Sequence, residues 1–90
     1  MSTRDEKLEK LYRLITALET EEECKTLLED LCTTKEIEKM AERVWAAQLL
    51  LEGNTYQQVM QRSDISSATL SRVSRCVQYG NGYKNLLKEQ

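Results

Sequence analysis

The chain has 90 residues, of which 31% are charged, and its formal net charge of −2 does not by itself suggest a nucleic-acid partner. This length suffices for one small domain whose core would be marginal in a monomer. Histidine is absent and Cys24, Cys32 and Cys76 show no Cys-x-x-Cys spacing, so no metal site is expected. No apolar run is long enough for a signal peptide or a membrane span. We therefore expect a cytoplasmic protein with reduced cysteines and no membrane attachment.

Apolar residues recur at steps of three and four along the first half of the chain, whereas the alternation typical of strands is absent. An all-α fold is therefore expected. The first helix is predicted over residues 5–19. The second begins after Thr20, where Glu23 completes a capping box. It is expected to end near Leu31 and to bury an apolar stripe that consists of Cys24, Leu27, Leu28 and Leu31.

The third predicted helix, which ends at Gly53, carries an apolar surface too broad for one neighbouring helix. Leu49, Leu50 and Leu51 are consecutive and so point in three directions. We expect a homodimer in which a second copy buries much of this surface. The alternative is a central helix surrounded by its own chain. Trp45 is expected in the core or the dimer interface, and the core is expected to consist of Leu, Ile, Val and Met because phenylalanine is absent.

Residues 55–77 are predicted to form two short helices joined by a tight turn, a helix-turn-helix unit. Thr55 can cap the first of these helices, with Gln58 at the spacing of a capping box. Val59 and Met60 are expected to be its apolar anchors.

The second helix of this unit follows a break at Ser63-Asp64, and either Ser66 or Ser67 can cap it. Helical periodicity divides it into two sides. One side consists of Ser66, Thr69, Leu70, Val73, Ser74 and Val77. The other side, which carries small residues and arginines, consists of Ser67, Ala68, Ser71, Arg72 and Arg75.

The second of these sides suits the major groove of DNA. Small side chains let a helix approach base edges closely, hydroxyls can hydrogen-bond to bases or phosphates, and arginine can bind guanine or phosphate. The alternative is a short amphipathic helix whose solvent-exposed side is rich in serine and arginine.

The distribution of charge supports the DNA-binding interpretation. The first 52 residues carry eight cations and thirteen acids, whereas the chain from Gly53 onward carries five cations and two acids. An acidic half joined to a basic half is typical of a protein that presents one phosphate-binding surface.

We expect a single domain over residues 1–90, with dimerisation helices in 1–53 and the helix-turn-helix in 55–77. A turn at Gly80–Gly82 is predicted to precede a terminal helix over 83–90, which carries Tyr83, Leu86 and Leu87.

Four stretches of the chain resemble the Trp repressor family: Thr33-Thr34-Lys35-Glu36, Arg43-Val44, Leu50-Leu51-Glu52-Gly53 and Ala68-Thr69-Leu70-Ser71-Arg72. The last of these is among the most specific. The resemblance holds residue by residue over about half of the chain, and the whole chain is similar to the YerC/YecD subgroup of the family. The first two predicted helices resemble those of the family only as helices, without a residue-by-residue match.

The resemblance implies an intertwined all-helical homodimer that binds double-stranded DNA and regulates transcription. The second helix of each helix-turn-helix would enter the major groove, and half-sites would lie about one helical turn apart in a palindromic operator. By position, Ser67, Ala68 and Ser71 would face bases. Gln58, Gln61 and Arg75 would contact phosphates. A phosphate contact is also the simplest role for Arg72.

The resemblance also implies a candidate effector site. Family members that respond to tryptophan hold it between two arginines that match Arg43 and Arg72, with Thr33 at a loop position of the pocket. Val73 stands where those members have glycine, and its isopropyl group would occupy volume that the ligand needs. Cys76 replaces a small polar residue nearby. We therefore expect no cofactor, and any effector is expected to differ from tryptophan. The simplest alternative for Arg43 is a solvated side chain.

Two other classes of function remain open on the sequence alone. One is a helical module that binds only protein. The other is a small all-α enzyme of the chorismate-mutase type, which would need inward-facing arginines and a carboxylate. Beyond Arg43 no such cluster is evident, and histidine is absent for acid–base catalysis, so we expect no enzymatic activity. Within the DNA-binding class, transposases and replication initiators share the same motif.

Overall fold

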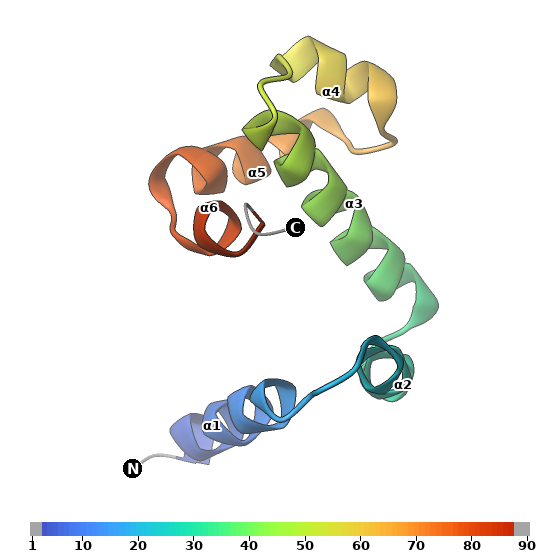
Figure 1. The fold of residues 1–90 in the computed structure, drawn as a ribbon, viewed down its shortest axis with the longest axis vertical. Helices are drawn as coiled ribbons and strands as arrows, with labels where there is room; N and C mark the ends of the chain where they lie inside the picture. Colours follow the sequence, from blue (N-terminus) through green and yellow to red (C-terminus); the bar gives the residue numbers. More distant parts are fainter. Residues whose placement is uncertain (1–2, 88–90) are drawn as a thin grey trace. The chain divides into compact units, whose positions relative to one another are not determined.

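The computed structural model describes residues 3–87, and every regular element in that range is helical (Figure 1). The prediction of an all-α fold is confirmed. The helices are α1 (Thr3–Thr16), α2 (Glu21–Leu31), α3 (Thr34–Leu51), α4 (Tyr56–Arg62), α5 (Ser67–Tyr79) and α6 (Gly82–Leu87). The chain divides into two compact units, Met1–Thr34 and Lys35–Gln90, which are described separately. Residues 88–90 of the predicted terminal helix lie outside the described range.

In the first unit, α1 ends earlier than predicted. The amide of Leu18 donates to the carbonyl of Ile15 (3.2 Å) in a tighter turn that ends the α-helical pattern. At the start of α2, Oγ1 of Thr20 accepts from the amide of Glu23 (3.0 Å), as predicted for an N-cap. The carboxylate of Glu23 accepts instead from the amide of Glu19 (2.9 Å), so the reciprocal bond forms one residue earlier than in a capping box.

The prediction that α2 buries an apolar stripe is wrong for the single chain. None of the residues of α1 or α2 is buried, and Leu31 is 51% exposed. Cys24, Leu27 and Leu28 are half-buried. Two short amphipathic helices have too little surface to enclose the apolar side of each other, so this side stays partly open to solvent.

The end of α3 depends on Gly53, as predicted. Its φ of +98° lies in the left-handed region, which favours glycine. The amide of Gly53 donates to the carbonyl of Leu50, and the amide of Asn54 donates to that of Leu49, each at 3.1 Å. This pair of bonds is a Schellman motif, and it turns the chain from α3 into α4.

The core of the second unit joins the carboxyl half of α3 to α4 and α5. Its buried residues are Ala46, Ala47, Leu49, Val59, Ile65, Leu70, Val73 and Val77. Tyr83 and Leu87 of α6 pack against this cluster, and α6 lies beside α5 (Figure 1). Ala46 and Ala47 are the part of α3 that is completely buried in this cluster.

Two predictions about the core are wrong. Met60 is 36% exposed and does not anchor α4, because it follows Val59 by one residue and so points about 100° away from it. No methionine is among the buried residues of the described range. Trp45 is 54% exposed in the single chain, which leaves the dimer interface as the predicted location for it.

None of the described helices combines the length and hydropathy that a membrane span requires. Within residues 3–87 no group of His, Cys, Asp and Glu side chains is arranged to hold a metal ion, and the three cysteines are free thiols.

Candidate nucleic-acid interface

The α4–α5 pair is fixed at its start by a complete capping box. The amide of Gln58 donates to Oγ1 of Thr55 (3.2 Å), and the amide of Thr55 donates to Oε1 of Gln58 (2.8 Å). Both bonds satisfy amides that have no partner within the helix. The capping box predicted from the sequence is confirmed, and it orients α4, which carries two candidate phosphate contacts.

The connection between the two helices is a short, hydrogen-bonded turn. The hydroxyl of Ser63 donates to the carbonyl of Val59 (2.8 Å), and the amide of Asp64 donates to Oε2 of Glu42 on α3 (3.3 Å). Ile65 is buried in the core and anchors the middle of the turn. The turn is therefore held at its first residue, Ser63, and at the two residues that follow.

Ser66, and not Ser67, caps α5. Its Oγ accepts from the amide of Thr69 (3.2 Å) and donates to Oγ1 of the same residue (2.9 Å). Ser67 is consequently the first residue of α5, and its side chain is exposed. The sequence left the choice between these two serines open.

The two sides of α5 separate as periodicity predicts. Leu70, Val73 and Val77 are buried, and Val73 is only 1% exposed. The opposite side is exposed along its length and consists of Ser67, Ala68, Ser71, Arg72 and Arg75. On α4, Gln58 and Gln61 are also exposed. All seven residues predicted for DNA contact are thus accessible to a ligand.

The arginines of this surface carry uncompensated positive charge. Within the described residues, neither Arg72 nor Arg75 forms an ion pair, whereas Arg4 pairs with Asp5 and Arg13 with Glu9 on α1. Asp64 is the only acid between α4 and the end of α5. An exposed cation with no nearby carboxylate is available to a phosphate.

Two residues of this surface were not singled out from the sequence. Arg62 is exposed at the end of α4 and donates to Oδ1 of Asn54 (3.1 Å). Tyr56, at the start of α4, donates from its hydroxyl to the carbonyl of Ser67 (2.8 Å). The positive charge of the second half of the chain could have pointed to Arg62. No sequence pattern could have pointed to the contact of Tyr56, because its hydrogen-bond partner is eleven residues away.

A hollow of about 260 Å³ lies where α3 meets the turn, and it includes one of the candidate effector residues. Arg43 lines it together with Lys39, Glu42, Asp64, Ile65, Ser66 and Thr69. Arg72 is exposed on α5 and is not among the lining residues, and Thr33 precedes α3 in the first unit. Arg43 lines this hollow and Arg72 does not, and the effector site stays a prediction.

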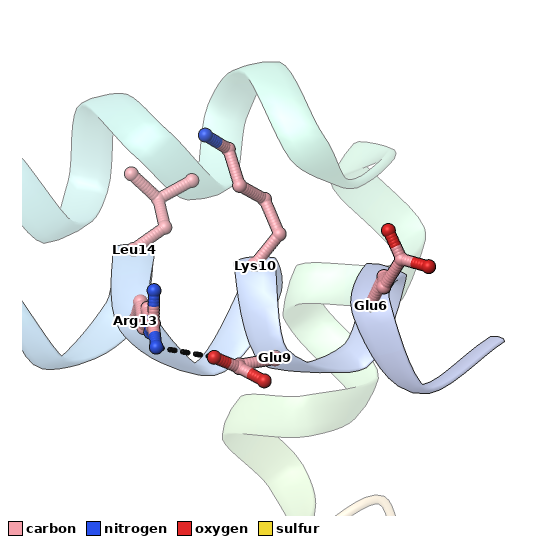
Figure 2. Close-up of a pocket in the computed structure, with 5 residues that line it drawn as sticks. All are labelled: Glu6, Glu9, Lys10, Arg13 and Leu14. Carbon is pink, nitrogen blue, oxygen red and sulfur yellow. Dashed lines mark ion pairs between the residues drawn. The ribbon is translucent and has the colours of Figure 1, made fainter. Parts of the chain in front are cut away.

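A larger hollow, of about 490 Å³, lies on α1 and is lined by charges of both signs. Figure 2 shows Arg13 turned toward Glu9, with which it forms an ion pair, while Lys10 and Leu14 point together to another side of the helix. Glu6 completes the lining. Two acids balance two cations here, so this surface offers no net charge to an anion.

The fold and the site together define a class: a small all-helical protein in which a short helix, held by a capped turn, presents hydroxyls and arginines to solvent. The Trp repressor protein family matches residues 6–90. An uncharacterised protein of Bacillus subtilis (strain 168), YerC, is 44% identical over 78 residues, which cover 87% of this chain and 75% of YerC.

Solved structures agree with this relationship. A Trp repressor candidate from Staphylococcus aureus superposes with a TM-score of 0.85 at 40% identity, covering 91% of this chain and 83% of its own. A TrpR-like protein from Eubacterium eligens gives a TM-score of 0.85 at 34% identity, covering 93% and 88% respectively. The chain therefore belongs to the Trp repressor family, as its motifs indicated.

Proposed function

We propose that this protein is a sequence-specific, DNA-binding transcriptional regulator that acts as a homodimer. The observation that carries the proposal is the exposed side of α5, where small residues and unpaired arginines follow one another on a helix whose opposite side is buried. Membership of the Trp repressor family supports the same conclusion.

The chemistry of this surface divides between two kinds of contact. Ser67, Ala68 and Ser71 are short enough for the α5 backbone to lie close to the base edges of the major groove. Arg72 and Arg75 on α5, with Gln58 and Gln61 on α4, suit the phosphates on either side. Base contacts confer sequence preference, whereas phosphate contacts supply affinity for any duplex.

Apolar surface that the single chain leaves uncovered supports the homodimer. A hollow of about 510 Å³ is lined almost entirely by apolar groups: Val44, Cys76, Gly80, Gly82, Tyr83, Leu86 and Leu87. Leu86 is 71% exposed, and Trp45 on α3 is also exposed. A second copy of this chain is the occupant we propose, because two copies paired about a two-fold axis would each cover the same apolar patch on the other. Two copies related by a two-fold axis would match a palindromic operator.

A small-molecule effector, if the regulator has one, would use Arg43, Arg72 and Thr33, and it would differ from tryptophan. Burial of Val73 in the core supports this exclusion, because its side chain fills the position beside Arg72 that a planar ligand would need. We place the regulator in the cytoplasm, where its DNA is, and assign it no enzymatic activity and no cofactor.

Selection from random duplexes by the purified full-length protein tests the proposal, with light scattering to measure its mass in solution. We expect a two-fold symmetric enriched sequence and the mass of a dimer. Parallel selections with and without a pool of amino acids would show whether an effector changes binding. A chain that is monomeric, that heparin does not retain and that enriches no sequence at low salt would contradict the proposal and favour a protein-binding module.

A further inference from the structure

The hydroxyl of Tyr56 contacts Ser67 at two places. It donates to the backbone carbonyl of Ser67 (2.8 Å), and it lies 3.1 Å from Oγ of the same residue. Tyr56 opens α4 and Ser67 opens α5, so this pair joins the first turns of the two helices. Both residues are exposed at the candidate interface.

The direction of the second hydrogen bond follows from the number of protons. A phenol has one hydroxyl proton, and a carbonyl oxygen can only accept. Because the shorter bond uses the proton of Tyr56 for the carbonyl, we assign the contact with Oγ as a bond in which Ser67 donates its own proton to the oxygen of Tyr56. The hydroxyl of Ser67 is then left with lone pairs and no proton for any other partner.

We infer that Tyr56 fixes Ser67 as a hydrogen-bond acceptor toward DNA. In the major groove the base-edge donors are the N6 amino group of adenine and the N4 amino group of cytosine, whereas O6 of guanine and O4 of thymine accept. Ser67 therefore selects adenine over guanine, or cytosine over thymine, at the base it contacts. Tyr56 is a positioning residue, since it acts through Ser67. This inference rests on the proposed function, in which α5 enters the major groove.

The test begins with duplex selection by the full-length wild-type protein and by the Ser67→Ala variant. The position whose base preference the variant loses is the position that Ser67 contacts. We expect adenine or cytosine there in the wild-type selection, favoured about three- to tenfold over guanine or thymine respectively, the range of one neutral hydrogen bond.

Two further measurements separate positioning from a structural role. Tyr56→Phe keeps the ring and removes the hydroxyl, which frees the proton of Ser67. We expect the ratio of preferred to disfavoured base at that position to fall to about one, while the affinity for a non-specific duplex stays unchanged. The melting temperature should fall slightly, because the hydrogen bonds of the Tyr56 hydroxyl are lost. Replacing the selected base by its analogue without the amino group (purine for adenine, 2-pyrimidinone for cytosine) should weaken wild-type binding about three- to tenfold and leave binding by Ser67→Ala unchanged.

The outcomes distinguish the two hypotheses. If the wild-type protein enriches no sequence, the proposed function fails. If it enriches a sequence but Ser67→Ala changes no position, or if the selected base there is guanine or thymine, the acceptor role is wrong although the regulator stands. A Tyr56→Phe variant that retains the wild-type preference, or that weakens specific and non-specific binding equally, also overturns the inference. The base-analogue experiment needs only the wild type and Ser67→Ala, so it does not depend on whether Tyr56→Phe folds.

Discussion

Arg62 at the end of α4 donates to the side-chain oxygen of Asn54, and the amide group of Asn54 in turn donates to the carbonyl of Leu49 (2.9 Å) at the end of α3. One side chain thus links the last turns of two helices. Because Arg62 is held here, its guanidinium is oriented at the edge of the candidate interface.

Asn54→Ala should lower stability, because it removes both of these hydrogen bonds while the backbone bonds of the Schellman motif stay. We expect a loss of about 1–2 kcal/mol in the free energy of unfolding, measured by urea denaturation followed by circular dichroism. Asn85→Ala on α6, at an exposed position, serves as the control. Equal stabilities of the two variants would show that the Asn54 link is not stabilising.

Gly53→Ala should also destabilise the protein, and here the cause is the backbone alone. Nothing lies within 4 Å of a Cβ at this position, but the φ of +98° strains any other residue. The expected cost is about 1–2 kcal/mol. Gly82→Ala is the matched control, because it has equal space and no positive φ. A Gly53→Ala variant as stable as Gly82→Ala would contradict the assignment of strain.

Arg75→Ala should weaken binding to all duplexes by a similar factor and reduce the slope of log K against log salt by about one unit, as expected for the loss of one phosphate contact. Fluorescence anisotropy over a range of salt concentrations measures both quantities. Lys25→Ala on α2 removes the same charge from an exposed residue that belongs to neither α4 nor α5, and it should leave the slope unchanged. If Arg75→Ala leaves the slope of log K against log salt unchanged, Arg75 does not contact a phosphate.

Ser71→Ala should instead alter base preference with little effect on non-specific affinity, because its hydroxyl is assigned to a base and carries no charge. The expected change is about tenfold or less at one position. Comparing the sequences enriched by the variant and by the wild type provides the measurement. Uniform loss of affinity across sequences would place Ser71 at the phosphates.

Leu86→Lys should dissociate the proposed homodimer. Leu86 is largely exposed in the single chain, so the substitution should cost little within one copy, but a buried lysine at an apolar interface is strongly unfavourable. Light scattering at several concentrations should show a shift toward the monomer mass. Tyr79→Lys alters a neighbouring exposed residue that does not line the apolar hollow, and it should leave the mass unchanged.

Features that depend on neighbours in sequence were predictable. The structure contains the predicted caps at Thr20 and Thr55 and the predicted helix end at Gly53, and each depends on hydrogen bonds between residues at most five positions apart. Helical periodicity likewise assigned Val73 to the buried side of α5. These assignments need only local hydrogen bonding and the 3.6-residue repeat.

Features that depend on distant residues were not predictable. The link from Tyr56 to Ser67 spans eleven residues and exists only because the turn brings two helix starts together. Exposure of Met60 and Trp45 depends on which neighbours cover each helix, which periodicity does not determine. The choice of Ser66 over Ser67 as the cap depends on where the buried Ile65 fixes the turn.

The buried residues of the described chain all lie between positions 46 and 77. A protease that cuts near Thr34 would therefore leave the interior of Lys35–Gln90 intact while releasing a peptide with no interior of its own. Brief digestion of the dilute protein should yield a resistant carboxyl-terminal fragment, and concentrations that favour pairing should slow the cut.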